Sequence, residues 1–316
     1  MKSLFVSVLA LALVGAAPIP APIPALAPKP FPAPSEIVAA APARDWVAIA
    51  PADVLVMTLG NGKQILIQLM PPPFSQGWVG NIRKLATAHW WDGLSVNRVQ
   101  DNYVVQWGDA SEKKALPDGL VSVQEKEYVS STNVTSVNVG GIIRDEPETD
   151  IYKFSYNDAY AHVVGYLHGW LLAGGNGALW PVHCYGMVGV GRNLSPDTGS
   201  GAELYTVIGH APRHLDRNIA VVGRVINGIE NLSSLPRGTG ALGFYEKPEE
   251  RIAITSVRLA SELPAAAQPR FEYLSTESES FAAYADARAN RRDPFFIKPA
   301  GGADICNIPV PVRKKP

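Results

Sequence analysis

The sequence predicts a mainly β fold, organised as a barrel or a sandwich. Many short strand-like runs are separated by turn residues, and few segments carry helical spacing. The clearest strand pair is Val54 to Leu59 and Gln64 to Met70, because Asn61-Gly62 between them supplies the positive φ angles of a tight hairpin. The chain has 316 residues, 47% of them hydrophobic, which is enough for a sizeable core.

Further elements follow this hairpin in order. Trp78, Ile82 and Leu85 lie at helical spacing, which predicts a helix from Ser75 to Trp91. The strands expected after it are Leu94 to Val99, Tyr103 to Trp107, Val182 to Val190, Glu203 to Gly209, Ile219 to Val225 and Ile252 to Leu259, with a short helix at Gly228 to Leu235. Residues 110–181 are interpreted as a large insertion, with a helix-like patch from Tyr160 to Leu172.

Both ends of the chain carry extensions. Residues 1–17 resemble a signal peptide, because Lys2 precedes an apolar run that ends in small residues; an uncleaved anchor is the alternative, since Pro18 hinders cleavage. Residues 18–43 are rich in Pro and Ala and predict an extended linker, with folding beginning near Asp45. The barrel is expected over residues 44–262, and 263–316 form a C-terminal extension. This extension should contain one helix, with Thr276 and Glu279 as a capping box, and an extended or loose end at 301–316.

Charge and composition exclude some functions. Twenty-eight basic and 29 acidic residues give a net charge of −1 without a basic stripe, which argues against nucleic-acid binding. The only two cysteines, Cys184 and Cys306, either pair after export or leave Cys184 as a small buried hydrophobic residue. We expect no metal site, because Pro212 separates His210 from His214 and keeps them off one helical face.

Three sequence blocks carry the functional signal. They are Trp91-Asp92-Gly93-Leu94-Ser95-Val96-Asn97-Arg98-Val99 with Asn102-Tyr103-Val104-Val105-Gln106-Trp107-Gly108-Asp109, then Tyr185 to Asn193, then Ala202 to Thr206 with His214-Leu215-Asp216 and Val222 to Val225. In this order they resemble the signature of the cyclophilin-type peptidyl-prolyl cis/trans isomerases. The resemblance runs from about Asp53 to Leu259. It implies a closed, antiparallel, eight-stranded barrel with capping helices.

The resemblance also implies a reaction and a site. Rotation about an X-Pro bond has a barrier of about 20 kcal/mol and breaks no bond, so neither cofactor nor metal is needed. Arg98 would hydrogen-bond the prolyl nitrogen in the twisted transition state, and Gln106 would hold the guanidinium and the substrate backbone. The other expected substrate-binding residues are Tyr103, Val104, Val188, Gly189, Glu203, Tyr205, His214, Leu215 and Ile219. The expected partners are proline-containing polypeptides, met by a periplasmic or secreted monomer that leaves the membrane after signal cleavage.

Several positions depart from the family pattern. Asn97, Gly189 and Glu203 replace the family's His, Asn and Gln; His214 and Ile219 replace its Trp and its pocket His. An ionised Glu203 accepts hydrogen bonds only and could neutralise Arg98. The alternative function is therefore a cyclophilin-like binding or chaperone module with little isomerase activity. The loss of the family's Trp and His also predicts weak inhibition by cyclosporin.

Overall fold

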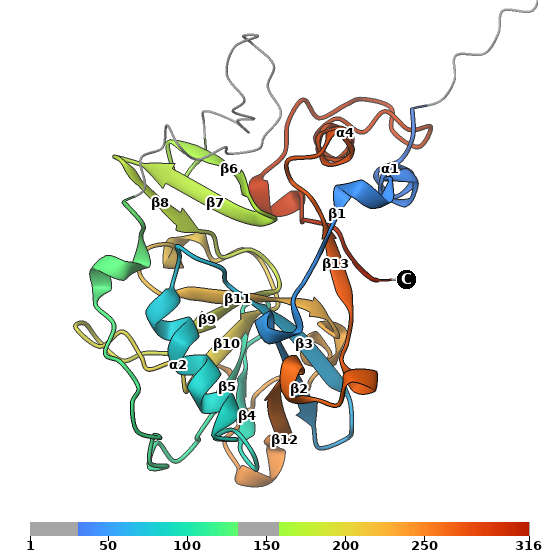
Figure 1. The fold of residues 1–316 in the computed structure, drawn as a ribbon. Helices are drawn as coiled ribbons and strands as arrows, with labels where there is room; N and C mark the ends of the chain where they lie inside the picture. Colours follow the sequence, from blue (N-terminus) through green and yellow to red (C-terminus); the bar gives the residue numbers. More distant parts are fainter. Residues whose placement is uncertain (1–30, 132–157, 316) are drawn as a thin grey trace, which may run out of the picture.

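The computed structural model describes residues 31–131 and 158–315, and its centre is a closed antiparallel barrel (Figure 1). The barrel strands are β2 (Val54–Leu59), β3 (Gln64–Leu69), β4 (Ser95–Val99), β5 (Val104–Gly108), β9 (Met187–Val190), β10 (Leu204–Val207), β11 (Val221–Asn227) and β12 (Ile252–Leu259). They are hydrogen-bonded in the order β10-β5-β4-β12-β2-β3-β11-β9, and β9 pairs with β10 to close the ring. The predicted mainly β, eight-stranded barrel is confirmed.

The β2–β3 hairpin forms as its turn chemistry predicts. Gly62 has φ +79°, and the side-chain oxygen of Asn61 accepts the Lys63 backbone N–H at 3.0 Å. Alternate strand residues point to opposite faces, and the inward residues Met57 and Ile67 are at most 1% exposed. The hairpin therefore provides one wall of the barrel core.

The helix α2 (Gln76–Thr87) packs against β11 and β12 on the outside of the barrel. Trp78, Ile82 and Leu85 are completely buried, so the helical spacing in the sequence marked the buried face correctly. The helix ends four residues before the predicted Trp91. A second helix, α3 (Glu230–Ser233), lies within the predicted short helix.

Outside the barrel, the segment following residue 158 forms a second sheet of β6 (Val163–Leu167), β7 (Trp170–Gly175) and β8 (Ala178–Pro181). The predicted helix-like patch from Tyr160 to Leu172 is therefore wrong. His168 and Gly169 both have positive φ, at 47° and 81°, and make the turn that pairs Leu167 with Trp170. A two-residue turn of this kind is typical of a hairpin and interrupts a helix.

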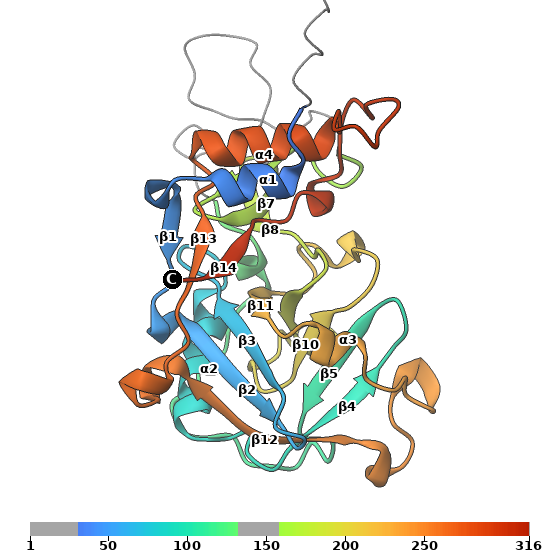
Figure 2. The same cartoon turned by 90° about the vertical axis from the view of Figure 1, so that its right-hand side faces the viewer.

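The two ends of the described chain meet in a third structural unit. It contains α1 (Pro34–Ala40), β1 (Trp46–Ala48), β13 (Phe271–Leu274), α4 (Glu279–Ala289) and β14 (Val312–Lys314). The strands pair in the order β1-β13-β14, and α1 lies beside α4 (Figure 2). Folding does not begin near Asp45 as predicted, because Ile37, Val38 and Ala41 already pack against the core. The expected signal peptide and residues 18–30 of the expected linker lie outside the described residues.

The C-terminal extension is attached to the body at several points. The helix α4 is capped by Ser278, whose hydroxyl accepts the Phe281 N–H at 3.1 Å, and not by the predicted Thr276. Cys184, just before β9, forms a disulfide with Cys306, so the two cysteines pair. The last residues lie along the body, where β14 pairs with β13.

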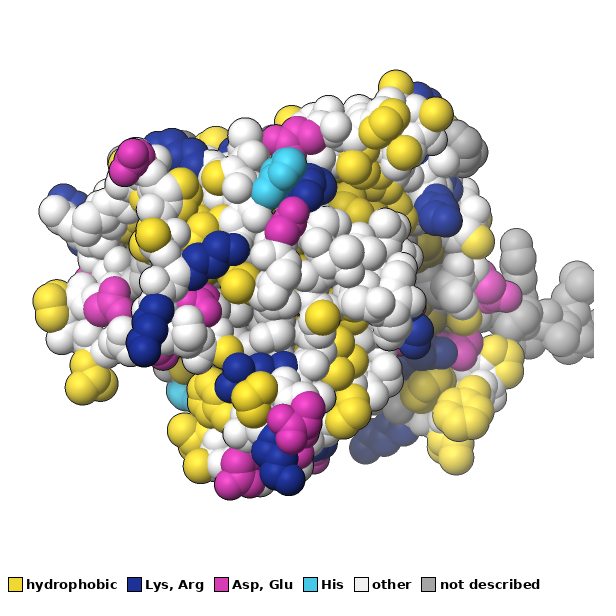
Figure 3. Space-filling model, turned by 90° about the horizontal axis from the view of Figure 1, so that it is seen from below, with side chains coloured by type: hydrophobic (Ala, Val, Ile, Leu, Met, Phe, Trp, Pro, Cys, Tyr) yellow, Lys and Arg dark blue, Asp and Glu magenta, His cyan; other side chains and the backbone are white. Residues whose placement is uncertain are grey.

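Within residues 31–131 and 158–315, no helix has the length and apolar character required to cross a membrane. On the face seen from below, acidic, basic and hydrophobic side chains are interspersed (Figure 3).

Candidate functional site

The predicted catalytic pair lies on adjacent strands. Arg98 of β4 and Gln106 of β5 are register partners, and an irregularity in the register lies between Val96 and Arg98. Arg98 Nη1 donates to the side-chain oxygen of Gln106 at 3.3 Å. Val105 and Trp107 point into the main core, so the intervening Gln106 faces the outside of the barrel. The pair therefore lies on the outer wall, where a polypeptide could reach it.

A loop from a distant part of the chain helps to hold the Arg98 guanidinium. Nε donates to the carbonyl oxygen of Leu242 at 2.7 Å, and Nη2 donates to the side chain of Gln100. The guanidinium carbon lies 5.3 Å from the ring centroid of Phe244 and 5.6 Å from that of Tyr103. Such cation–π contacts fix a cation without neutralising it.

Arg98 keeps its charge in this setting. Burial lowers the pKa of Arg98 from its ordinary value, but an arginine stays protonated in proteins. Within the described part of the chain, Arg98 has no carboxylate salt-bridge partner. The neutralisation by Glu203 considered from the sequence does not occur through a direct ion pair.

The predicted proline pocket forms a small apolar cluster beside this arginine. Its members converge from β5, β10 and the turn that follows β10; they are Val104, Tyr205 and Val207, with Tyr103, Leu215 and Ile219 packed against them. His214 stacks on Tyr103, with ring centroids 6.4 Å apart and an interplanar angle of 14°. The structure thus brings together the pocket residues predicted from the sequence and adds Val207.

Two further predicted residues lie on β9, on opposite faces. Val188 is 1% exposed and packs in the main barrel core. Gly189 pairs with Tyr205 on one side and with Val221 on the other. A Cβ atom at Gly189 would lie 2.3 Å from Cζ and from the hydroxyl oxygen of Tyr205, so glycine is required for the tyrosine ring to occupy its place. The main-chain contact of Gly189 with a substrate stays a prediction.

Glu203 lies one step further along the same wall, just before β10. Gln106 Nε2 donates to Glu203 Oε2 at 3.4 Å, so a chain of hydrogen bonds runs from Arg98 through Gln106 to Glu203. Burial raises the pKa of Glu203 to about 7, against the opposing effect of the Gln106 hydrogen bond, and Glu112 and Asp109 raise it further. At neutral pH this carboxyl is divided between its neutral and ionised forms.

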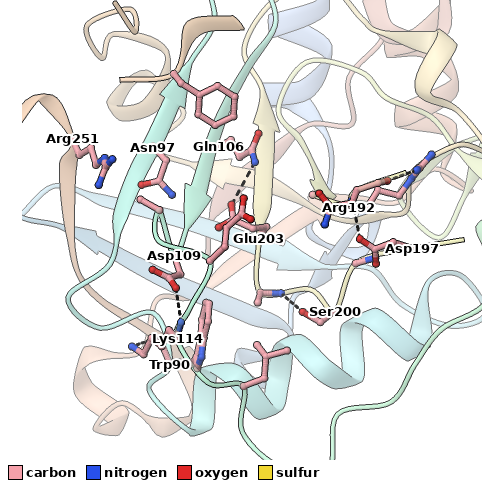
Figure 4. A pocket seen from close by; sticks show the side chains of 18 of the residues that line it. Trp90, Asn97, Gln106, Asp109, Lys114, Arg192, Asp197, Ser200, Glu203 and Arg251 are labelled. Carbon is pink, nitrogen blue, oxygen red and sulfur yellow. Dashed lines mark hydrogen bonds between the residues drawn. The ribbon is translucent and has the colours of Figure 1, made fainter. Parts of the chain in front are cut away.

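A cavity of about 500 Å³ opens beside Gln106 and Glu203 (Figure 4). Its wall includes the acidic residues Asp109, Glu112, Asp197 and Glu203 and the basic residues Lys114, Arg192 and Arg251. Among the described residues, no three His, Cys, Asp or Glu side chains are placed to hold a metal ion. The site therefore consists of a cationic centre between an apolar cluster and a polar cavity.

Sequence comparison decides the family. The model of the family "Cyclophilin type peptidyl-prolyl cis-trans isomerase/CLD" matches residues 57–259, which include every strand that carries the site. The chain belongs to this family. A search among curated proteins finds no match.

A solved cyclophilin structure resembles the chain over most of its length. The crystal structure of the cyclophilin AquaCyp293 from Hirschia baltica aligns with a TM-score of 0.64 at 20% identity, covering 85% of this chain and 92% of that one. A cyclophilin-type isomerase from Cryptosporidium parvum, crystallised in the presence of the dipeptide Ala-Pro, aligns with a TM-score of 0.38 at 10% identity, covering 65% and 98%. The first of these supports the cyclophilin fold of the barrel.

Sequence reasoning missed three contributors to the site. Leu242 and Phe244 reach Arg98 from a loop that no motif marks. His183, which is completely buried, bonds to the hydroxyl group of Tyr205. The tyrosine that His183 contacts lies 22 positions further along the chain, so no local pattern links the two residues. The one signal in the sequence is that His183 lies beside the second cyclophilin-like block.

Proposed function

We propose that the protein isomerises X-Pro bonds in exposed, extended segments of exported proteins and so assists their folding. The observation that carries this proposal is the placement of Arg98, a cation without a salt-bridge partner in the described residues, beside the apolar cluster of Tyr103, Val104, Tyr205, Leu215 and Ile219. The cyclophilin family supplies the reaction. The arrangement can bind a prolyl ring and place a hydrogen-bond donor next to it.

The chemistry follows from the change in the amide bond. Rotation breaks the resonance of the amide and localises a lone pair on the prolyl nitrogen, so a donor aimed there binds the transition state more tightly than the ground state. A guanidinium has five N–H groups, and the described residues accept hydrogen bonds from three of the nitrogens through Leu242, Gln106 and Gln100. Each terminal nitrogen therefore retains one N–H group for a substrate.

Export is supported by two observations. The first 17 residues have the charge and apolar pattern of a signal peptide. Cys184 and Cys306 form a disulfide, a bond that persists in oxidising compartments such as the periplasm or the extracellular space. We therefore propose that the protein acts there as a soluble monomer on proline-containing polypeptides.

The alternative function is peptide binding without useful catalysis, and Glu203 is the observation that favours it. A carboxyl that is partly ionised at neutral pH stands where the family has a neutral glutamine, one hydrogen bond away from Gln106. It could hold Gln106 away from a substrate.

An NMR exchange experiment on a proline tetrapeptide separates the two functions. We expect the protein to accelerate cis/trans exchange at substoichiometric amounts. Chemical-shift changes of the peptide without faster exchange would show a binding module. The absence of both chemical-shift changes and faster exchange would contradict both functions.

A further inference from the structure

A series of buried, hydrogen-bonded polar side chains leads away from the apolar cluster around Tyr205, which is the predicted proline pocket. The Tyr205 hydroxyl oxygen lies 2.8 Å from His183 Nε2, and His183 Nδ1 lies 2.9 Å from Asp216 Oδ1. Arg213 Nε donates to the other oxygen of Asp216 at 2.6 Å, and its two terminal nitrogens donate to Asp158 at 3.1 and 3.0 Å. The side chains of His183, Asp216, Arg213 and Asp158 are at most 5% exposed.

Asp216 determines which ring nitrogen of His183 donates towards it. The Asp216 carboxylate can only accept hydrogen bonds, so His183 Nδ1 carries the proton between them. In the neutral imidazole, Nε2 is then an acceptor for the Tyr205 O–H. Both rings also stack, with centroids 6.2 Å apart and an interplanar angle of 11°. The hydrogen bond and the stacking contact with His183 thus hold the position and the orientation of the Tyr205 ring.

Gly189 provides the space that the Tyr205 ring occupies. The Tyr205 ring occupies the space where a Cβ of residue 189 would stand, so it lies between β9 and His183. A buried hydroxyl group that lost its partner would have to move to find another one. Because Tyr205 belongs to the apolar cluster, such a movement changes the pocket that would receive the prolyl ring.

The other hydrogen-bonded residues of this series, Arg213 and Asp216, support a second part of the apolar cluster. Arg213 and Asp216 flank His214 and Leu215, and the 3-10 turn Arg213–Leu215 presents both residues to the cluster. Burial alone would lower the pKa of Arg213, but Asp216 and Asp158 outweigh it and raise the pKa above its ordinary value. The ion pairs therefore keep Arg213 protonated and hold the turn in place.

Asp158 brings this support from outside the barrel. It precedes β6 of the three-stranded sheet, and the nearby Tyr160 ring lies 5.1 Å from the Arg213 guanidinium carbon. The cyclophilin-like blocks of the sequence do not include this segment. The part of the chain interpreted from the sequence as an insertion therefore supplies the last partner of this series.

We propose that His183 and Asp158 are positioning residues of the proline pocket, His183 through the ring of Tyr205 and Asp158 through the turn that carries His214 and Leu215. The proposal rests on the proposed isomerase function. The pocket would hold the prolyl ring in the ground state and in the transition state alike, so its distortion weakens both. KM should then rise more than kcat falls.

The test measures isomerase kinetics for His183→Leu, Asp158→Ala and Tyr205→Phe. We expect each variant to raise KM by about three- to tenfold and to change kcat by less than about twofold. Tyr205→Phe keeps the apolar ring and removes only the hydrogen bond to His183, so it remains informative if His183→Leu fails to fold. The matched control is Tyr166→Phe, which removes another buried hydroxyl group, bonded at 2.7 Å to the Ile308 carbonyl in the C-terminal extension. Its KM should equal that of the unmutated protein.

Binding of the proline tetrapeptide, measured by calorimetry on the same proteins, separates the two proposals. If the unmutated protein binds the peptide without isomerising it, the isomerase function fails, and weaker binding by the variants would still support the positioning role. Unchanged KM and unchanged affinity in folded Tyr205→Phe and Asp158→Ala proteins would overturn the inference. An equal loss in Tyr166→Phe would also overturn it, because the effect would then reflect general destabilisation.

Discussion

Glu203 should make the stability of the protein depend on pH. Burial raises the pKa of its carboxyl from an ordinary value of 4.5 to about 7 in the folded protein. Below pH 4.5 the carboxyl is mostly neutral in the folded and in the unfolded protein, so it does not lower the free energy of unfolding. As the pH rises towards 7, the unfolded chain releases this proton more readily than the folded protein does, so stability is lost across this window and stays constant above it.

The magnitude follows from the pKa difference. One pKa unit corresponds to about 1.4 kcal/mol, so the full difference would amount to about 3 kcal/mol. The carboxyl retains some contact with solvent through the cavity, so we expect about 2 kcal/mol in practice. Glu203→Gln, which stays neutral at every pH, should match the unmutated protein near pH 4.5 and exceed its stability by this amount at pH 8.

Urea unfolding at pH values from 4.5 to 8 measures this difference. Other groups titrate in the same range, but the comparison between the two proteins removes their contribution. The matched control is Glu249→Gln, which replaces an exposed carboxylate and should change stability little at any pH. Parallel pH profiles for Glu203→Gln and the unmutated protein would refute the reasoning that burial controls this group.

Three more predictions follow from the site and the disulfide. Glu203→Gln should raise isomerase turnover at pH 8, because a neutral amide restores the family's residue next to Gln106; unchanged or lower turnover would show that the carboxylate has its own role. His214→Trp should strengthen cyclosporin inhibition in a drug titration, because an indole offers more apolar surface and an N–H donor; tight inhibition of the unmutated protein would contradict this view. Cys306→Ser should lower the free energy of unfolding by about 2–4 kcal/mol, since the disulfide spans 122 residues; an unchanged thermal midpoint would count against it.

Local patterns predicted the individual strands, and the resemblance to the cyclophilin signature predicted that the strands close into a barrel. The Asn61-Gly62 turn fixed the first hairpin, and β2 and β12 begin and end where the apolar runs predicted. The pocket followed from the resemblance to the cyclophilin signature, which places Arg98 opposite Gln106 across one hairpin. These features depend on residues that are close in sequence or share one motif.

Other parts depended on tertiary contacts and were missed. Apolar residues between 160 and 172 fit a helical spacing, but the paired positive φ angles of His168 and Gly169 make a hairpin. Helix α1 lies in a segment whose prolines suggested a linker, and it is covered by α4 from the other end of the chain. The bond between His183 and Tyr205 joins the segment before β9 to β10, a contact that no local pattern reveals. Tertiary packing decided each of these cases.

The role of Arg98 is the central claim, and isomerase kinetics of Arg98→Ala test it most directly. The measurement compares this variant with the unmutated protein and with Arg44→Ala. The Arg44 side chain lies between α1 and β1 and is 83% exposed. We expect Arg98→Ala to keep its thermal unfolding midpoint and to lose at least about tenfold in turnover, equivalent to about 1.4 kcal/mol of transition-state stabilisation. Arg44→Ala should be fully active. A folded Arg98→Ala protein with unchanged turnover would contradict the account.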